Sequence, residues 1–190
     1  MSWLAPFDAL VSAWPAGWGG KVLRLIAWKR RFGACGRVHF GDGLVISGFD
    51  GISIGDNTSF MSRSYLYAND SGKLTIGRNC SFNHNVVLGA ASGTIILGND
   101  VLVGPNVVLR AADHEFGDCD RLIRTQGHRR GTIVIGNDVW LGANVVVTSG
   151  ARVGDGCVVG AGSVVTGDLP AMSDRMGSPA RPVHSRTREG

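Results

Sequence analysis

Residues 135–170 read IGNDVW LGANVV VTSGAR VGDGCV VGAGSV VTGDLP when they are written in sixes. Each block opens on an aliphatic residue, and its second residue is glycine in four blocks and threonine in the other two. A fixed short period of this kind indicates one structural unit stacked on itself. An α-helix would scatter every sixth residue around its surface, because six is not a multiple of 3.6. Three flat faces of six residues would instead bury every opening residue, so we predict an all-β solenoid, a parallel β-helix with about 18 residues per turn.

The same register runs through the preceding sequence with interruptions. It begins weakly at Val38, and three further turns open on Ile54, Ile76 and Leu97. Small slips between these turns are expected as bulges at the corners, which a solenoid tolerates on its outside. Glycine, with 29 residues, recurs at fixed places in the period and therefore marks corners rather than a low-complexity chain.

One large insertion interrupts the coil. Leu109 and Ile135, which should be neighbouring openers, are 26 residues apart, and the excess lies at residues 115–131. An excursion this long from a regular fold is usually functional. The predicted organisation is a helical cap at 1–34, a β-helix domain at 35–170 that contains the insertion, and a C-terminal extension at 171–190.

The first 34 residues do not follow the period. Large apolar residues at helical spacing predict a first helix, namely Trp3, Leu4, Phe7, Leu10, Val11 and Trp14. A second, basic helix is predicted at about 21–32, with Val22, Leu25 and Ile26 on its apolar side. One interpretation is a cap over the open end of the coil. The other is contact with a membrane surface, because tryptophan with Lys and Arg is typical of interfacial helices.

Composition narrows the function classes. The formal net charge is +4, and no basic stripe with interleaved aromatic residues is present, so we do not expect nucleic acid as a partner. The four cysteines form no C-x-x-C pair and give no metal pattern, so no metal is expected. Apolar stretches are shorter than the ~20 residues that span a bilayer, and a signal peptide is not recognisable. We therefore expect a cytoplasmic protein, with peripheral contact at the inner face of the membrane as an open alternative.

The motifs resemble those of the hexapeptide-repeat acyltransferases. Five segments carry the resemblance in order, across about residues 50–183: FNHNVV at 82–87, VGPNVVLRAADHEF at 103–116, IGNDVWLGANVVV at 135–147, VGAGSVVTGDLP at 159–170 and GSPARPV at 177–183. Within that group the chain is similar to the maltose and galactoside O-acetyltransferases and the polysaccharide O-acetyltransferases. The resemblance implies a left-handed coil, a homotrimer with active sites at subunit interfaces, and acetyl-CoA as co-substrate.

His114 is the predicted catalytic residue. It follows Asp113 where the chain leaves the coil, directly before the insertion. An imidazole can accept a proton from a hydroxyl or an amine at neutral pH. Its match to the family's catalytic histidine implies a general base that activates the acceptor for direct attack on the thioester. Asp113 is a candidate for orienting the ring or contacting the substrate, and Glu115 is an alternative.

The polar group Asn83, His84 and Asn85 lies one turn earlier. The resemblance makes Asn83 a candidate for contact with the acceptor, with Asn85 and His84 as further candidates. The competing interpretation is that the asparagines occupy coil corners, where a left-handed backbone is needed. One histidine does not make a metal site.

The regular stretch is predicted to hold the coenzyme. Trp140 ends its hexad and, by the resemblance, forms a wall where the acceptor and the thiol arm of coenzyme A meet. Ala143 and Ala161 correspond to places where the family's backbone contacts the pantetheine arm. Thr166 and Arg181 match the part that holds adenine and phosphate, and guanidinium suits phosphate geometry. A packing role for Trp140 and a solvated Arg181 are the competing interpretations.

Three functions remain open from the sequence. The first is O-acetylation of a sugar hydroxyl, in the synthesis of surface polysaccharide or lipopolysaccharide. The second is N-acetylation of a nucleotide-linked amino sugar by the same base. The third is a non-catalytic or metal-binding β-helix, for which the coils offer only His84 and His114 as ligands.

Overall fold

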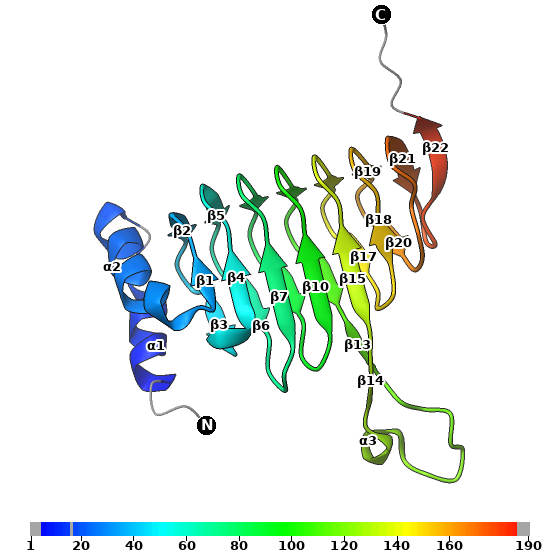
Figure 1. Cartoon of the computed structure of the whole chain (residues 1–190), viewed down its shortest axis with the longest axis horizontal. Coiled ribbons are helices and arrows are strands. Elements are labelled where there is room, and N and C mark those ends of the chain that lie inside the picture. Colours follow the sequence, from blue (N-terminus) through cyan, green and yellow to red (C-terminus); the bar gives the residue numbers. More distant parts are fainter. Residues whose placement is uncertain (1–4, 16, 186–190) are drawn as a thin grey trace, which may run out of the picture.

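The computed structural model describes residues 5–15 and 17–185, and Trp3 and Leu4 of the first predicted helix lie outside them. The chain winds through a parallel β-helix, and most turns add one strand to each of three sheets (Figure 1). Sheet A contains β1 (Ala34–Cys35), β4 (Ile52–Ile54), β7 (Lys73–Ile76), β10 (Thr94–Leu97), β15 (Thr132–Ile135) and β18 (Arg152–Val153). The predicted all-β solenoid of hexapeptide repeats with helices at its N-terminal end is therefore confirmed.

The other two sheets complete the prism. Sheet B contains β2 (Val38–Phe40), β5 (Thr58–Phe60), β8 (Ser81–Phe82), β11 (Leu102–Val103), β16 (Trp140–Leu141), β19 (Val158–Val159), β21 (Ser173–Met176) and β22 (Arg181–Ser185). Sheet C contains β3 (Val45–Ser47), β6 (Tyr65–Tyr67), β9 (Val87–Gly89), β12 (Val108–Arg110), β17 (Val146–Val147) and β20 (Val164–Val165). Within a turn the chain passes from sheet A to sheet B, then to sheet C. We call the turn between B and C the B–C corner, and the far side of sheet C the C–A edge.

Alternation along each strand separates the core from the surface. In β16, Leu141 is fully buried and Trp140 points outward, and the other two-residue strands repeat this pattern. Successive strand residues point to opposite faces, so the hexad openers line the interior. At the corners, left-handed asparagines turn the chain, and their side chains form ladders, such as Asn57 to Asn79 at 3.1 Å. The six-residue period thus reflects one corner per face and two inward residues, the opener and the fifth residue, such as Leu141 and Val145.

Stacked aromatic rings continue from the cap into the first turns of the coil. Phe32 stacks on Phe40, Phe40 on Phe60, and Phe60 on Phe82, with the last pair of ring centroids 4.6 Å apart. The last three rings come from adjacent strands of sheet B, in register. Offset stacking adds to the burial of large apolar area. This column ties the cap to the β-helix.

Replacing Phe82 by alanine should lower the free energy of unfolding by about 3–5 kcal/mol, because the cavity left in a rigid coil cannot close. Guanidinium denaturation at a fixed protein concentration measures the change. The matched control is Ser81→Ala on the same strand, facing outward, which should change stability by less than about 0.5 kcal/mol. Equal effects of the two substitutions would contradict an inward aromatic column.

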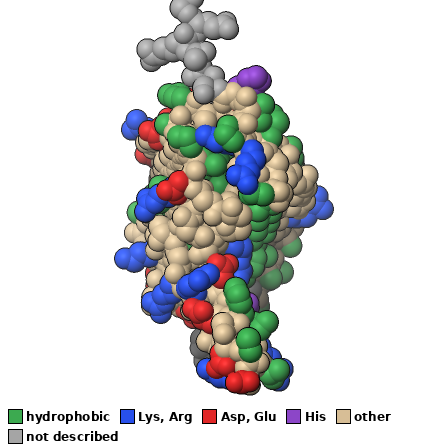
Figure 2. All heavy atoms as spheres, turned by 90° about the vertical axis from the view of Figure 1, so that its right-hand side faces the viewer, with side chains coloured by type: hydrophobic (Ala, Val, Ile, Leu, Met, Phe, Trp, Pro, Cys, Tyr) green, Lys and Arg blue, Asp and Glu red, His purple; other side chains and the backbone are tan. Residues whose placement is uncertain are grey.

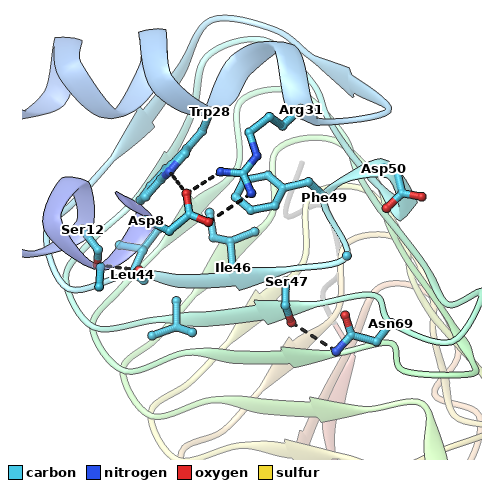
Figure 3. Close-up of a pocket in the computed structure, with 13 residues that line it drawn as sticks. Asp8, Ser12, Trp28, Arg31, Leu44, Ile46, Ser47, Phe49, Asp50 and Asn69 are labelled. Carbon is cyan, nitrogen blue, oxygen red and sulfur yellow. Dashed lines mark hydrogen bonds and ion pairs between the residues drawn. The ribbon is translucent and has the colours of Figure 1, made fainter. Parts of the chain in front are cut away.

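The helical cap is fastened to the coil by polar side chains. It consists of α1 (Ala5–Ala13), α2 (Trp18–Trp28) and the 3₁₀ turn η1 (Lys29–Arg31). Arg24 is fully buried, and its guanidinium donates to the Phe40 carbonyl at 2.9 Å and the Trp14 carbonyl at 2.7 Å. Asp8 accepts hydrogen bonds from Arg31 and from the Trp28 indole (Figure 3). Burial lowers the pKa of Arg24, and the charge of Asp42 opposes that effect.

The prediction that Val22, Leu25 and Ile26 form the buried side of the second helix is wrong. Ile26 is 72% exposed and Val22 is 38% exposed, whereas Arg24 and Trp28 face the coil. Leu25 is only partly buried against the core. Arg24 supplies a donor to the Phe40 carbonyl at the open end of the coil, and Trp28 donates to Asp8, which aliphatic residues could not do.

Candidate functional site

Several predicted residues stack along the B–C corner. Backbone hydrogen bonds show that four residues occupy the same position in successive turns, namely His84, Pro105, Ala143 and Ala161. Asn106 N donates to the His84 carbonyl at 3.0 Å, Asn144 N to that of Pro105 at 2.9 Å, and Gly162 N to that of Ala143 at 2.8 Å. His84 and Ala161 are exposed, and Ala143 is partly buried. The corner therefore changes from histidine and proline to small residues toward the C-terminal turns.

Asn85 has a structural role at this corner. Its φ is 58°, in the left-handed region, and its amide donates to Asn106 at 3.1 Å. Asn106 donates in turn to Asn144 at 3.1 Å, which forms a ladder along three turns. The Asn83 side chain accepts a hydrogen bond from the backbone of His84 at 2.8 Å and is partly buried. The corner interpretation thus accounts for Asn85, and acceptor contact by Asn83, His84 and Asn85 stays a prediction.

Trp140 lies on the outer face of sheet B, beside the B–C corner. Its neighbour in the preceding turn is Leu102, in register across β11 and β16. Both side chains are 53% exposed. Two exposed large apolar residues side by side form a wall that is available to a ligand or to another subunit.

His114 sits at the base of a projecting hairpin. The strands β13 (Ala112–His114) and β14 (His128–Arg130) pair antiparallel, with His114 opposite His128. The hairpin leaves the coil after β12 and returns before β15, and it extends away from the prism (Figures 1 and 2). The two imidazole centroids are 4.2 Å apart. Asp113 points to the opposite face of the hairpin, where its carboxylate is 4.0 Å from Arg129.

The tip of the hairpin is ordered by its own side chains. The Gln126 amide donates to the backbone carbonyls of Asp118 at 2.8 Å and Arg121 at 2.9 Å, and it accepts from Asp118 N at 3.1 Å. Gly127 follows the short helix α3 (Ile123–Gln126) with φ 92°, a conformation that suits glycine. The strand that carries His128 therefore begins from a fixed turn.

Two residues near His114 were not predicted. Arg110 ends β12 and donates a hydrogen bond to the hydroxyl of Tyr67, two turns earlier. Gly89 lies between them, and a Cβ there would come within 2.2 Å of that hydroxyl. One signal could have identified this pair, namely Gly89, which lies in register between Tyr67 and Arg110. These side chains cover the outer face of sheet C close to where the hairpin begins.

Thr166 and Arg181 lie in the C-terminal turns. Thr166 follows β20 and is exposed at the C–A edge. Arg181 opens β22 and is exposed, next to Ala180, whose N–H donates to the Val164 carbonyl at 2.9 Å. Among the described residues, neither the Thr166 hydroxyl nor the Arg181 guanidinium forms a hydrogen bond with Ala143 or Ala161.

The predicted residues fall into two groups within one chain. Asn83, Ala143 and Ala161 precede strands of sheet C, and His114 follows one. Because these strands are parallel, one group lies where the strands of sheet C begin and the other where they end. A groove of about 850 Å³ lies between the cap and the first turns and is lined by residues that include Trp28, Leu44 and Phe49 (Figure 3). None of the predicted site residues lines that groove, so we do not assign the chemistry to it.

Among residues 5–15 and 17–185, no cluster of three or more His, Cys, Asp or Glu side chains is arranged to hold a metal ion. In the same part of the chain, no helix is long and apolar enough to cross a bilayer.

Residues 132–167 match the family of bacterial transferase hexapeptides with six repeats. The galactoside O-acetyltransferase of Escherichia coli (strain K12) is 35% identical over 119 residues, which cover 62% of this chain and 57% of that protein. The chain spans about half the length of the curated relatives that it matches first, between 42% and 57%.

Solved structures with the same fold include two acyltransferases. The hexapeptide-repeat containing acetyltransferase VCA0836 of Vibrio cholerae is 27% identical with a TM-score of 0.66, and the match covers 96% of this chain and 89% of that one. An N-acyltransferase of Bacillus cereus, in complex with dTDP and 3-hydroxybutyryl-CoA, has a TM-score of 0.74 at 22% identity, covering 87% and 89%. At 22% identity, the similarity to the Bacillus cereus structure shows a shared fold and nothing about activity. The resemblance to hexapeptide-repeat acetyltransferases is confirmed by the family and sequence matches.

Proposed function

We propose that this chain, whose repeats are those of bacterial hexapeptide transferases, transfers acetyl from acetyl-CoA to a sugar hydroxyl. The observation that carries the proposal is the position of His114. It lies at the base of the hairpin of β13 and β14, where the chain leaves the coil. His114 takes the proton of the hydroxyl as its oxygen attacks the thioester carbonyl. The coenzyme leaves as the thiol, and no acyl-enzyme is required.

Coenzyme A would lie along the B–C corner. Ala143 and Ala161 stack there without bulky side chains, so a narrow pantetheine arm can approach the backbone. The Ala143 carbonyl is already bonded to Gly162, so its N–H is the group that we expect to donate to the arm. Trp140 would exclude water from the thioester. Arg181 and, from the C–A edge of the neighbouring subunit, Thr166 are the proposed contacts of the nucleotide end, through guanidinium and hydroxyl.

The active site would need two copies of the chain. Within one copy, sheet C separates His114 from Ala143 and Ala161. In a cyclic homotrimer, the C–A edge of one subunit can face the B–C corner of the next. The outer face of sheet C supports such packing, because Val45, Tyr65 and Val87 form the start of an apolar column that continues through Val108, Val146 and Val164.

The acceptor class can be tested directly. Thiol release from acetyl-CoA is measured with methyl glycosides of glucose, galactose and N-acetylglucosamine, and with nucleotide-linked amino sugars. We expect release with a glycoside, consistent with a role in surface polysaccharide or lipopolysaccharide synthesis. Release only with the amino sugars would favour N-acetylation. Release with neither class would contradict the proposal.

We also propose that the cap contacts an anionic membrane surface, at the inner face if the protein is cytoplasmic. Residues 1–34 contain five of the 19 Lys and Arg and one of the 15 Asp and Glu, so they carry the whole formal net charge of +4. Lys29 and Arg30 are exposed. Leu10 and Ile26 are 73% and 72% exposed on the outer sides of α1 and α2, which cover the end of the coil (Figure 1). Basic and apolar groups on one helical surface are typical of interfacial helices.

Replacing both Leu10 and Ile26 by serine should reduce binding to vesicles of phosphatidylcholine with phosphatidylserine by about tenfold or more, since burial of each side chain is lost. Cosedimentation measures the bound fraction, and pure phosphatidylcholine vesicles report on the contribution of charge. Ile96→Ser, at a 40% exposed position on sheet A, is the matched control. Wild-type protein that stays in the supernatant with both vesicles would exclude the membrane contact.

A further inference from the structure

The hydrogen bonds at the two ends of the hairpin determine which side chains face each other closely. Glu115 N donates to the Gly127 carbonyl at 3.0 Å, and Gly131 N donates to that of Ala111 at 2.8 Å. Antiparallel pairs alternate between hydrogen-bonded and non-hydrogen-bonded sites, so the pair of His114 and His128 falls on a non-hydrogen-bonded site. Side chains at such sites are closest to each other. The ring contact at 4.2 Å and 37° is therefore a consequence of the hairpin register.

The other two cross-strand pairs of β13 and β14 lie away from the His114 ring. Asp113 and Arg129 face each other on the opposite side of the strands, 4.0 Å apart. Ala112 and Arg130 share the face of the two histidines, two cross-strand pairs closer to the coil. Within residues 5–15 and 17–185, His128 is the one residue that makes a ring contact, hydrogen bond or ion pair with the His114 side chain.

The strand that carries His128 is itself held in place. Gln126 fixes the turn before it through backbone groups of Asp118 and Arg121, and Gly127 supplies the φ of 92° that leads into β14. At the other end, the Ser149 hydroxyl donates to the Ala111 carbonyl at 3.3 Å, beside the base of the hairpin. The position of His128 thus follows from contacts at both ends of the hairpin.

We propose that His128 is a positioning residue for His114 in acetyl transfer, an inference that rests on the proposed function. Its ring covers one face of the His114 imidazole and restricts rotation of that ring about its side-chain bonds. The ring nitrogens lie in the plane of the imidazole, so packing on its face leaves them available to the acceptor hydroxyl. Rate depends steeply on the position of a catalytic group, because a displacement of about 1 Å can cost about a hundredfold.

The test compares three variants in the full-length protein. His128→Ala removes the ring, His128→Phe keeps a flat ring, and Arg129→Ala removes the neighbouring side chain on the opposite face. Acetyl-CoA and the methyl glycoside that gives the fastest thiol release are the substrates. We expect His128→Ala to lower kcat by about tenfold with little change in the KM for acetyl-CoA, His128→Phe to recover most of the loss, and Arg129→Ala to behave as wild type.

A second readout does not depend on activity. An adjacent aromatic ring shifts the proton resonances of the His114 imidazole, so NMR of the histidine ring protons should show that shift in the wild type and in His128→Phe but not in His128→Ala. The inference is overturned if His128→Ala retains the wild-type kcat, if His128→Phe is as slow as His128→Ala, or if Arg129→Ala is equally slow. Full turnover of a His114→Ala variant would instead refute the proposed function, and the resonance shift would still report on the ring contact.

Discussion

Replacement of His114 by alanine should lower kcat for acetyl transfer by about 10²–10⁴, the usual contribution of a general base. Binding of acetyl-CoA should survive, because the proposed coenzyme contacts at Ala143, Ala161 and Trp140 lie on other strands and corners. The measurement is thiol release at saturating acetyl-CoA, together with a calorimetric Kd for acetyl-CoA. The result follows from geometry, since His114 is exposed at the base of the hairpin, where an acceptor can reach it.

A matched control separates this loss from general damage. His39 is an exposed histidine on β2, beside the cap, and His39→Ala should keep full turnover. Partial desolvation, followed by the charges of Lys21 and Arg24, lowers the pKa of His39, which favours its neutral form. Undiminished turnover of His114→Ala would show that another group takes the proton.

The architecture could be predicted from the sequence because its physical cause is periodic. Each hexad buries its aliphatic opener and the small or apolar residue at its fifth position and turns one corner, so the pattern of Ile135, Leu141 and Val147 reports the interior directly. The cap was less predictable. α2 buries Arg24 rather than Ile26 because Arg24 supplies donors to the Phe40 carbonyl of the coil and the Trp14 carbonyl of the cap, and that demand comes from residues distant in sequence.

The candidate site was predictable only where a motif names a residue. His114 is marked by its motif and by the break in the period that follows it. His128 lies 14 residues later with no motif around it, and its contact with His114 depends on the register of a hairpin that six-residue periodicity does not describe. Arg110 and Tyr67 meet across two turns and a glycine, a relation that becomes visible only once the coils are stacked.

Mixed assemblies of two inactive variants should recover about a quarter of the wild-type rate if each site is shared between neighbouring subunits. One variant is His114→Ala, which lacks the base. The other is Ala161→Trp, whose bulky side chain would block the pantetheine arm at an exposed corner position without entering the core. In a random trimer at equal ratio, a site is intact when the subunit that contributes His114 is the Ala161→Trp copy and its neighbour is the His114→Ala copy.

Each of these two choices has a chance of about one half, so about one site in four is complete. The variants are unfolded and refolded together, and thiol release is compared with that of each variant refolded alone. A site contained in one chain would give no recovery, because every chain carries one of the two lesions. Recovery would therefore assign His114 and the B–C corner to different subunits, which is the arrangement that their separation by sheet C requires for a ternary complex.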